Sequence, residues 1–215
     1  MGYLDRNPLC PECFDSLIIL KDKICKRCGV LLKDGGAYCR QCRGSKAAKY
    51  KCKVVRSSFS FNEPARSLVH AFKYNGHLFL ADFFASYMTK TFKQTKEFAE
   101  VNLIIPVPLH KLKQRIRGYN QAGVLASKLA ENLGIEINDK ILKRNKFTAS
   151  QARLDKEHRK QNIKNAFVCK AALKGKTVLV VDDVATTTFT LEACADALKK
   201  AGAKTVYALT LAREL

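Results

Sequence analysis

The stretch from Thr177 to Leu191 constrains the fold more than any other part of the sequence, because it joins a buried strand to the start of a helix. Thr177 to Val181 is a short apolar run rich in β-branched residues, which is typical of a strand covered on both faces. From Leu191 onward, apolar residues recur at helical spacing as far as Gly202, the predicted end of the helix. The turn between strand and helix therefore lies where open α/β sheets bind their ligands.

Two acidic residues and several threonines occupy this turn. The unpaired N–H groups of a helix start favour a phosphate, and the hydroxyls add hydrogen-bond donors. Adjacent carboxylates would repel a phosphate, but they accept hydrogen bonds from vicinal sugar hydroxyls or bind Mg²⁺ through its waters. A sugar phosphate uses both halves, whereas in the alternative the Asp pair only caps the helix. The candidate residues are Asp182, Asp183, Ala185, Thr186, Thr187, Thr188 and Thr190.

The run Val-Val-Asp-Asp-Val-Ala-Thr-Thr-Thr-Phe-Thr-Leu that contains these residues resembles the phosphoribosyl pyrophosphate (PRPP) motif of type I phosphoribosyltransferases, and most closely that of the ComF (ComFC-like) competence proteins. The resemblance implies that the acids hold the ribose and the threonines the 5′-phosphate of PRPP, with Mg²⁺. The family usually has glycine at position 188, and a β-branched residue such as Thr188 tolerates a positive φ poorly. Either this loop keeps an ordinary φ or PRPP binding is weakened.

The net charge of +20 predicts polyanionic partners, namely nucleic acid, an anionic membrane face or a pyrophosphate-bearing substrate. Residues 1–50 hold ten basic and five acidic residues, and the remainder holds 29 and 14, so the basic excess is not confined to a tail. A generally basic, solvated surface is the alternative. With no long apolar run and no signal peptide pattern, we expect a soluble cytoplasmic protein, with peripheral membrane association left open.

Six of the nine cysteines form three Cys-x-x-Cys pairs, which in a cytoplasmic chain indicate zinc rather than disulfides. Two such pairs about ten residues apart close a ribbon around one tetrahedral ion. We favour Cys25, Cys28, Cys39 and Cys42, which resemble the second ribbon of the ComF family, and expect Cys10 and Cys13 to be a remnant of the first. A different pairing that includes Cys10 and Cys13 stays open. A lysine-rich connection then predicts two domains, a zinc ribbon over residues 1–50 and a phosphoribosyltransferase-like domain over 51–215.

Basic residues accompany the predicted site in three further segments. The segment around Lys73 resembles a ComF Lys-Tyr-x-Gly signature, so Lys73 is a candidate for holding substrate, although helix-end lysines also favour the helix dipole. After a buried strand, the sequence Pro-Val-Pro-Leu-His is followed by Arg115 and Arg117, which the resemblance places at the pyrophosphate loop. The polar, basic composition of residues 142–162 predicts a mobile basic lid. The lid candidates that match the family are Arg144, Gln151 and Arg159.

Strands alternate with helices over residues 54–211, which predicts an α/β fold. The expected architecture is a type I phosphoribosyltransferase-like, largely parallel sheet with helices on both faces, preceded by a small N-terminal zinc ribbon. The predicted function is binding of PRPP and Mg²⁺, with transfer of the phosphoribosyl group to an acceptor that the sequence does not identify. The alternative is a non-catalytic adaptor that binds single-stranded DNA in DNA uptake. The oligomeric state is left open.

Overall fold

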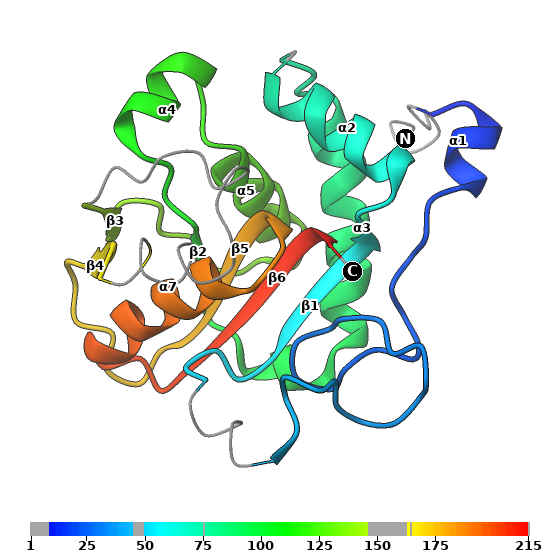
Figure 1. The fold of residues 1–215 in the computed structure, drawn as a ribbon. Helices are drawn as coiled ribbons and strands as arrows, with labels where there is room; N and C mark the ends of the chain where they lie inside the picture. Colours follow the sequence, from blue (N-terminus) through cyan, green and yellow to red (C-terminus); the bar gives the residue numbers. More distant parts are fainter. Residues whose placement is uncertain (1–8, 45–49, 75, 146–162, 164, 215) are drawn as a thin grey trace.

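The computed structural model describes residues 9–44, 50–74, 76–145, 163 and 165–214 of the chain. A four-stranded sheet forms its centre, with the strand order β1-β6-β5-β2 and all neighbouring pairs parallel (Figure 1). Parallel strands bring their carboxyl ends to one edge of the sheet. The strands of this sheet are β1 (Val55–Ser60), β2 (Leu103–Pro106), β5 (Thr177–Ala185) and β6 (Thr205–Arg213).

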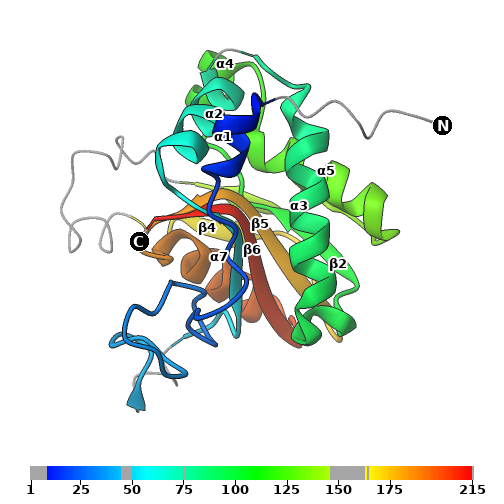
Figure 2. The same cartoon turned by 90° about the vertical axis from the view of Figure 1, so that its right-hand side faces the viewer.

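Helices cover both faces of the sheet, with α3 and α5 on one side and α7 on the other (Figure 2). This confirms the predicted architecture of a parallel sheet between helices. The long helices are α2 (Glu63–Tyr74), α3 (Leu80–Gln94), α5 (Gln121–Leu133) and α7 (Phe189–Lys200). No helix in the described part of the chain combines the length and the apolar character that crossing a membrane requires.

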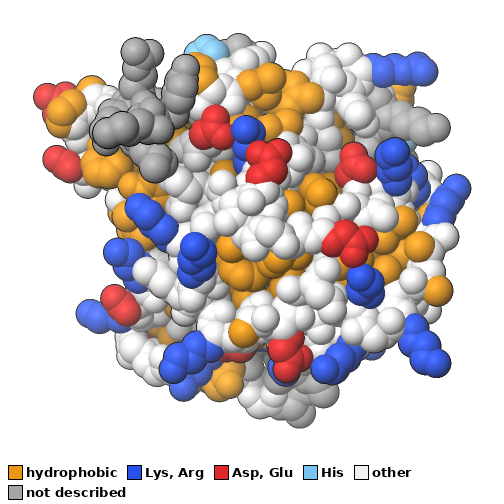
Figure 3. Space-filling view, turned by 180° about the vertical axis from the view of Figure 1, so that it is seen from behind, with side chains coloured by type: hydrophobic (Ala, Val, Ile, Leu, Met, Phe, Trp, Pro, Cys, Tyr) orange, Lys and Arg blue, Asp and Glu red, His pale blue; other side chains and the backbone are white. Residues whose placement is uncertain are grey.

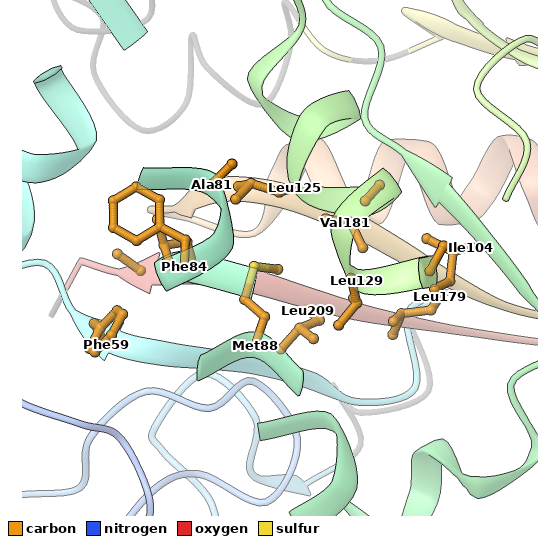
Figure 4. Packing of buried hydrophobic residues seen from close by; sticks show 14 of the residues in the cluster. Phe59, Ala81, Phe84, Met88, Ile104, Leu125, Leu129, Leu179, Val181 and Leu209 are labelled. Carbon is orange, nitrogen blue, oxygen red and sulfur yellow. The ribbon is translucent and has the colours of Figure 1, made fainter. Parts of the chain in front are cut away.

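The apolar side chains of β5 pack into two separate cores. Leu179 and Val181 lie against Met88 and the other buried side chains of α3 and α5 (Figure 4). Val178 and its neighbours on the opposite face pack against α7, where Cys194 is fully buried. Because successive side chains of a strand point to opposite faces, a strand between two helical layers needs apolar residues at every position.

Shorter elements surround the sheet: α1 (Pro11–Asp15), η2 (Lys96–Glu100), α4 (Lys111–Arg117), β3 (Leu142–Arg144) and β4 (Phe167–Cys169). Arg115 and Arg117, which the resemblance places at the pyrophosphate loop, lie on the short helix α4. The His110 side chain accepts a hydrogen bond from Leu112 N at 3.3 Å, and Gly118 ends the helix with a φ of +81°. The predicted lid begins as a strand, since β3 pairs antiparallel with β4. Its residues 146–162 lie outside the described part of the chain.

The N-terminal segment runs beside β1, the edge strand of the sheet. Leu20 N donates to Ser58 O at 3.0 Å, and Ser60 N donates to Ile18 O at 2.8 Å. These bonds use backbone groups that an open sheet edge would leave for another chain. The segment therefore covers the β1 edge, and the division into residues 1–50 and 51–215 stays a prediction.

Candidate sugar-phosphate pocket and cysteine site

The acidic pair lies within β5 rather than in the turn after it. We expected the strand to end at Val181, but β5 continues to Ala185 because β6 pairs with it along its whole length. Asp182 is opposite Thr210 in this register. The two carboxylates are thereby fixed at the carboxyl end of a central strand by backbone hydrogen bonds.

The two carboxylates have different surroundings. Lys73 Nζ lies 2.9 Å from Asp183 Oδ1, and both side chains are mostly buried. Asp182 Oδ1 accepts a hydrogen bond from Asp183 N at 2.9 Å. Burial raises the pKa of Asp182 to about 7, and the neighbouring charge of Asp183 adds to the rise, while Lys73 and Arg144 oppose it. At neutral pH, Asp182 is therefore poised between its protonated and ionised forms.

The threonine-rich loop between β5 and α7 lines a cavity of about 590 Å³ together with the acidic pair. Thr188 is the residue before α7; it has a φ of +60° in the left-handed region and makes no side-chain cap bond. Of the two alternatives for Thr188, an ordinary φ is therefore excluded, and weakened PRPP binding stays the prediction. A β-branched residue in this region is strained, since its Cβ approaches the following carbonyl. The candidate residues that line the cavity are Asp182, Asp183, Ala185, Thr186, Thr187, Thr188 and Thr190.

The structure brings some of the predicted cations to this cavity. Lys73, Arg117 and Arg144 line it, whereas Arg115 is exposed on α4 and is not among the lining residues. Arg117 donates to the Tyr74 hydroxyl at 2.7 Å and to Gln121 Oε1 at 3.2 Å, so it is held at the rim. The remaining lid candidates, Gln151 and Arg159, lie outside the described residues.

Two amide side chains that we did not select also line the cavity. Asn120 Nδ2 donates to Val107 O at 3.1 Å, and this fixes the exit from β2. Gln121 is almost fully buried, and its Nε2 donates to Lys73 O at 3.4 Å. The signal was available, because Asn120 and Gln121 directly follow the basic segment in a run that resembles the family signature.

The second candidate site is formed by four cysteines. The Sγ atoms of Cys25, Cys28, Cys39 and Cys42 all lie within 4.8 Å of one another, and three of the four side chains are buried. The Sγ atoms of Cys28 and Cys39 are 3.7 Å apart. Four sulfurs at about 2.3 Å from one tetrahedral Zn²⁺ would be separated by about 3.8 Å. The donor set and its spacing therefore fit a zinc ion.

Three further cysteines near the N-terminus do not join this cluster. Cys10 and Cys13 are exposed at α1, and Cys52 is fully buried in the core beneath α7. The favoured grouping of the four later cysteines is thus the one that the structure brings together.

The buried side chain of Arg213 provides positive charge near the cysteine cluster. Arg213 is 6% exposed, and its Nε and Nη1 have no hydrogen-bond partner among the described residues. Burial lowers the pKa of Arg213, and the cysteines of the cluster are the groups that oppose this shift. Because four thiolates and Zn²⁺ carry a net charge of −2, a metal-loaded cluster would attract the buried guanidinium of Arg213.

The knuckle, formed by residues 25–29, packs directly on β1. Val55 N donates to Arg27 O at 2.7 Å, and Arg56 donates to Lys26 O at 2.9 Å. A Cβ atom on Gly29 would lie 2.7 Å from Val55 O, and Gly29 has a φ of +71°. Only glycine allows this approach without strain, so the knuckle and β1 form one packed unit.

The fold, the acidic strand end and the hydroxyl-rich loop together define a protein of the phosphoribosyltransferase fold class. The family model described as "Phosphoribosyl transferase domain" matches residues 117–215. The chain is 31% identical to "Competence protein F" of Haemophilus influenzae over 98% of its own length and 93% of that protein. The chain therefore belongs to the competence protein F family.

Two further comparisons describe the range of similarity. The chain is 30% identical to "DNA utilization protein YhgH" of Salmonella typhimurium over 89% of its length and 85% of that protein. Among solved structures, a purine phosphoribosyltransferase from Pyrococcus horikoshii matches with a TM-score of 0.40 and 22% identity, covering 61% of this chain and 73% of that one.

Proposed function

We propose that this protein binds PRPP, or a closely related sugar phosphate, in the cavity at the carboxyl edge of the sheet. The observation that carries the proposal is that an acidic pair, a threonine-rich loop and a helix start line one cavity of about 590 Å³. Asp182 and Asp183 would accept hydrogen bonds from the ribose hydroxyls, and the loop would hold the 5′-phosphate through backbone N–H groups and hydroxyls.

The cations at the rim suit the pyrophosphate of PRPP. Lys73, Arg117 and Arg144 approach the cavity from three different elements. Carboxylate oxygens at the cavity fit Mg²⁺, and the ion would neutralise charge on the pyrophosphate when bound. In a transfer reaction, a lone pair of the acceptor would form a bond to the anomeric carbon. The bond between this carbon and the pyrophosphate oxygen would break, and its electrons would leave with pyrophosphate. The rim cations would stabilise that leaving charge.

A pair of substitutions tests the pocket. Asp182→Asn/Asp183→Asn keeps the size of both side chains but removes their charges, so the affinity for PRPP with Mg²⁺ should fall at least about tenfold, or about 1.4 kcal/mol. Isothermal titration measures the affinity, and circular dichroism checks the fold. Asp196→Asn, on the exposed face of α7, is the matched control. Unchanged affinity in the double variant would contradict the pocket.

We propose single-stranded DNA as the ligand of a second candidate function, because another cavity of about 840 Å³ carries a strong basic excess. It lies beside the cysteine site, and Glu97 is the one acidic residue among its described lining. The exposed ring of Tyr38 offers a surface for base stacking. The face in Figure 3 supports no such binding, since acidic side chains lie among its lysines and arginines. The cationic lining residues are Lys26, Arg27, Lys51, Lys53, Lys199 and Lys204.

Salt dependence tests this second function. Binding of a labelled oligonucleotide should be independent of sequence, and its affinity should fall at least about tenfold between low and physiological salt. Lys26→Ala/Lys53→Ala should weaken binding, whereas Lys93→Ala, outside the cavity, should not. A flat salt dependence would remove the electrostatic basis.

The relatives' names refer to competence and DNA utilization, and the nine unpaired cysteines suit a reducing cytoplasm, so we propose a cytoplasmic role in DNA uptake.

A further inference from the structure

Arg27 connects the cysteine site to the first turn of α7. Its guanidinium is buried, and Nη1 donates to Cys42 Sγ at 3.6 Å. Nη2 donates to Cys52 O at 3.3 Å and to the carboxylate of Glu192. The ring of Tyr50 lies 3.2 Å from the guanidinium carbon. One side chain of the zinc knuckle thus contacts a metal-ligating cysteine, the connecting segment and the helix.

Glu192 completes the connection from the side of the helix. Its second carboxylate oxygen accepts hydrogen bonds from Lys51 N at 2.7 Å and from Cys52 N at 3.2 Å. Acidic residues in the first turn of a helix commonly serve the N–H groups of that turn. In this chain the carboxylate of Glu192 instead faces the segment that carries the cysteines, so its contacts fix the position of the helix start.

The loop before α7 has little local support of its own. Thr188 makes no side-chain cap bond and has a left-handed backbone. Its carbonyl accepts a hydrogen bond from Glu192 N at 2.9 Å, which is the first bond of the helix. Glu192 therefore has two roles. Its side chain binds Arg27, and its backbone N–H closes the first helical turn next to the proposed phosphate site.

We propose that Arg27 and Glu192 are positioning residues that couple metal binding at the cysteine site to phosphate binding at the start of α7. A bound metal would fix Cys42 and Arg27, Arg27 would hold Glu192, and Glu192 would hold the first turn of α7 with its N–H groups directed at the phosphate. A loop that is ordered in advance binds its ligand more tightly, since less conformational entropy is lost on binding. The proposal rests on the sugar-phosphate pocket described above. By linkage, PRPP would tighten zinc binding by the same factor.

The affinity of the zinc-loaded protein for ribose 5-phosphate, and for PRPP with Mg²⁺, tests the coupling. Arg27→Lys and Glu192→Gln should each lower the affinity for both ligands about fivefold or more, which is the lower end of common coupling strengths. Asp196→Asn is the matched control, because it removes the Lys200–Asp196 pair on the same helix at 2.7 Å. Its affinity should equal that of the parent. Equal affinity of the parent, Arg27→Lys and Glu192→Gln overturns the coupling.

A double variant separates positioning from simple structural support. Arg27→Met/Glu192→Gln removes both members of the buried ion pair, so its melting temperature should recover relative to Glu192→Gln, which leaves the Arg27 charge without its carboxylate. Its phosphate affinity should stay low because the connection is still broken. Recovery of affinity together with the melting temperature would show a structural role only, and would overturn the proposal.

Hydrogen exchange tests the connection without any ligand. Removal of zinc from the parent by a chelator should accelerate amide exchange in Phe189–Glu192 more than in Ala197–Lys200. Equal acceleration along α7 would count against the coupling. A parent that binds neither sugar phosphate would refute the proposed function, whereas a parent that binds both while its variants bind equally well refutes only the coupling.

Discussion

The cysteine site and the sugar-phosphate pocket differ in how the chain builds them. All four cysteines come from residues 25–42, whereas the lining of the pocket comes from α2, α4, α5, α7, β3, β5 and the loops around them. A site made from one short stretch needs a ligand to hold that stretch together, because residues 16–44 contain no long helix or strand of their own. A site spread over many elements is held by the fold itself.

The two sites should therefore respond differently when each is disrupted. Loss of the metal should affect the stability of the cysteine site and of the β1 edge that it covers, while loss of the pocket's charges should affect ligand binding and leave the fold in place. Arg27 and Glu192 join the two regions, so a change at the cysteine site is expected to reach the start of α7 through them.

The largest effect is expected from breaking the cysteine site. Cys28→Ser should lower the free energy of unfolding by several kcal/mol, on the order of 4, since loss of a structural metal is among the most destabilising changes known. The melting temperature would fall by roughly 8–16 °C for a chain of this size. Thermal unfolding, with and without a chelator, measures the change.

The control for this prediction is Cys10→Ser, because Cys10 is exposed and lies outside the cluster. That variant should unfold like the parent. Metal analysis of protein purified without added zinc should give one equivalent per chain, because four cysteines are grouped and the remaining pair lacks partners among the described residues. Two full equivalents would contradict the grouping.

A smaller effect is expected from Asp182→Asn, and it should depend on pH. The pKa of Asp182 is raised from its usual value of 3.8 to about 7, so between these values the folded state keeps a proton that the unfolded state has lost. The stability of the parent therefore falls as pH rises through this window. Asparagine carries no charge at any pH.

The substitution should consequently raise the melting temperature at pH 8 and change it little near pH 4. Thermal unfolding without PRPP at both pH values measures the difference, with Asp196→Asn as the control of the same chemistry on an exposed surface. An equal effect of Asp182→Asn at both pH values would show that burial of this carboxylate costs nothing. A variant more stable than its parent but weaker in binding would illustrate the conflict between stability and function at a ligand site.

The sequence predicted the parts of the molecule that depend on local spacing. The cysteine pairs, the buried run from Thr177 to Val181 and the helix after the threonine-rich turn are each specified by neighbouring residues. Contacts between distant residues were not predicted, because no period or spacing relates them. Lys73 meets Asp183 and Arg27 meets Glu192 only after the sheet has formed, the second pair across 165 residues.

Element ends were also hard to predict where a neighbouring strand decides them. The pairing of Asp182 through Ala185 with β6 extends β5 beyond its apolar run, although acidic residues are poor strand formers. Here the backbone hydrogen bonds of an adjacent long strand prevail over local propensity.

The smallest expected effect concerns Thr188, where the chain departs from the family's glycine. A non-glycine residue in the left-handed region costs roughly 1–2 kcal/mol, and glycine costs about 0.5–1 kcal/mol in backbone entropy. Thr188→Gly should therefore raise the free energy of unfolding by about 0.5–1 kcal/mol, or the melting temperature by roughly 1–4 °C. Glycine also allows closer approach of the backbone to a phosphate, so PRPP affinity should rise.

Thr190→Gly is the matched control, because Thr190 is only two residues away but lies within α7. Glycine is less favourable than threonine in a helix by a few tenths of a kcal/mol, so this variant should be slightly less stable than the parent. Thermal unfolding and PRPP titration of both variants separate a strained backbone from the mere loss of a threonine. If both glycine variants lose stability equally, the left-handed conformation at Thr188 carries no strain, and the loop has adapted to its threonine.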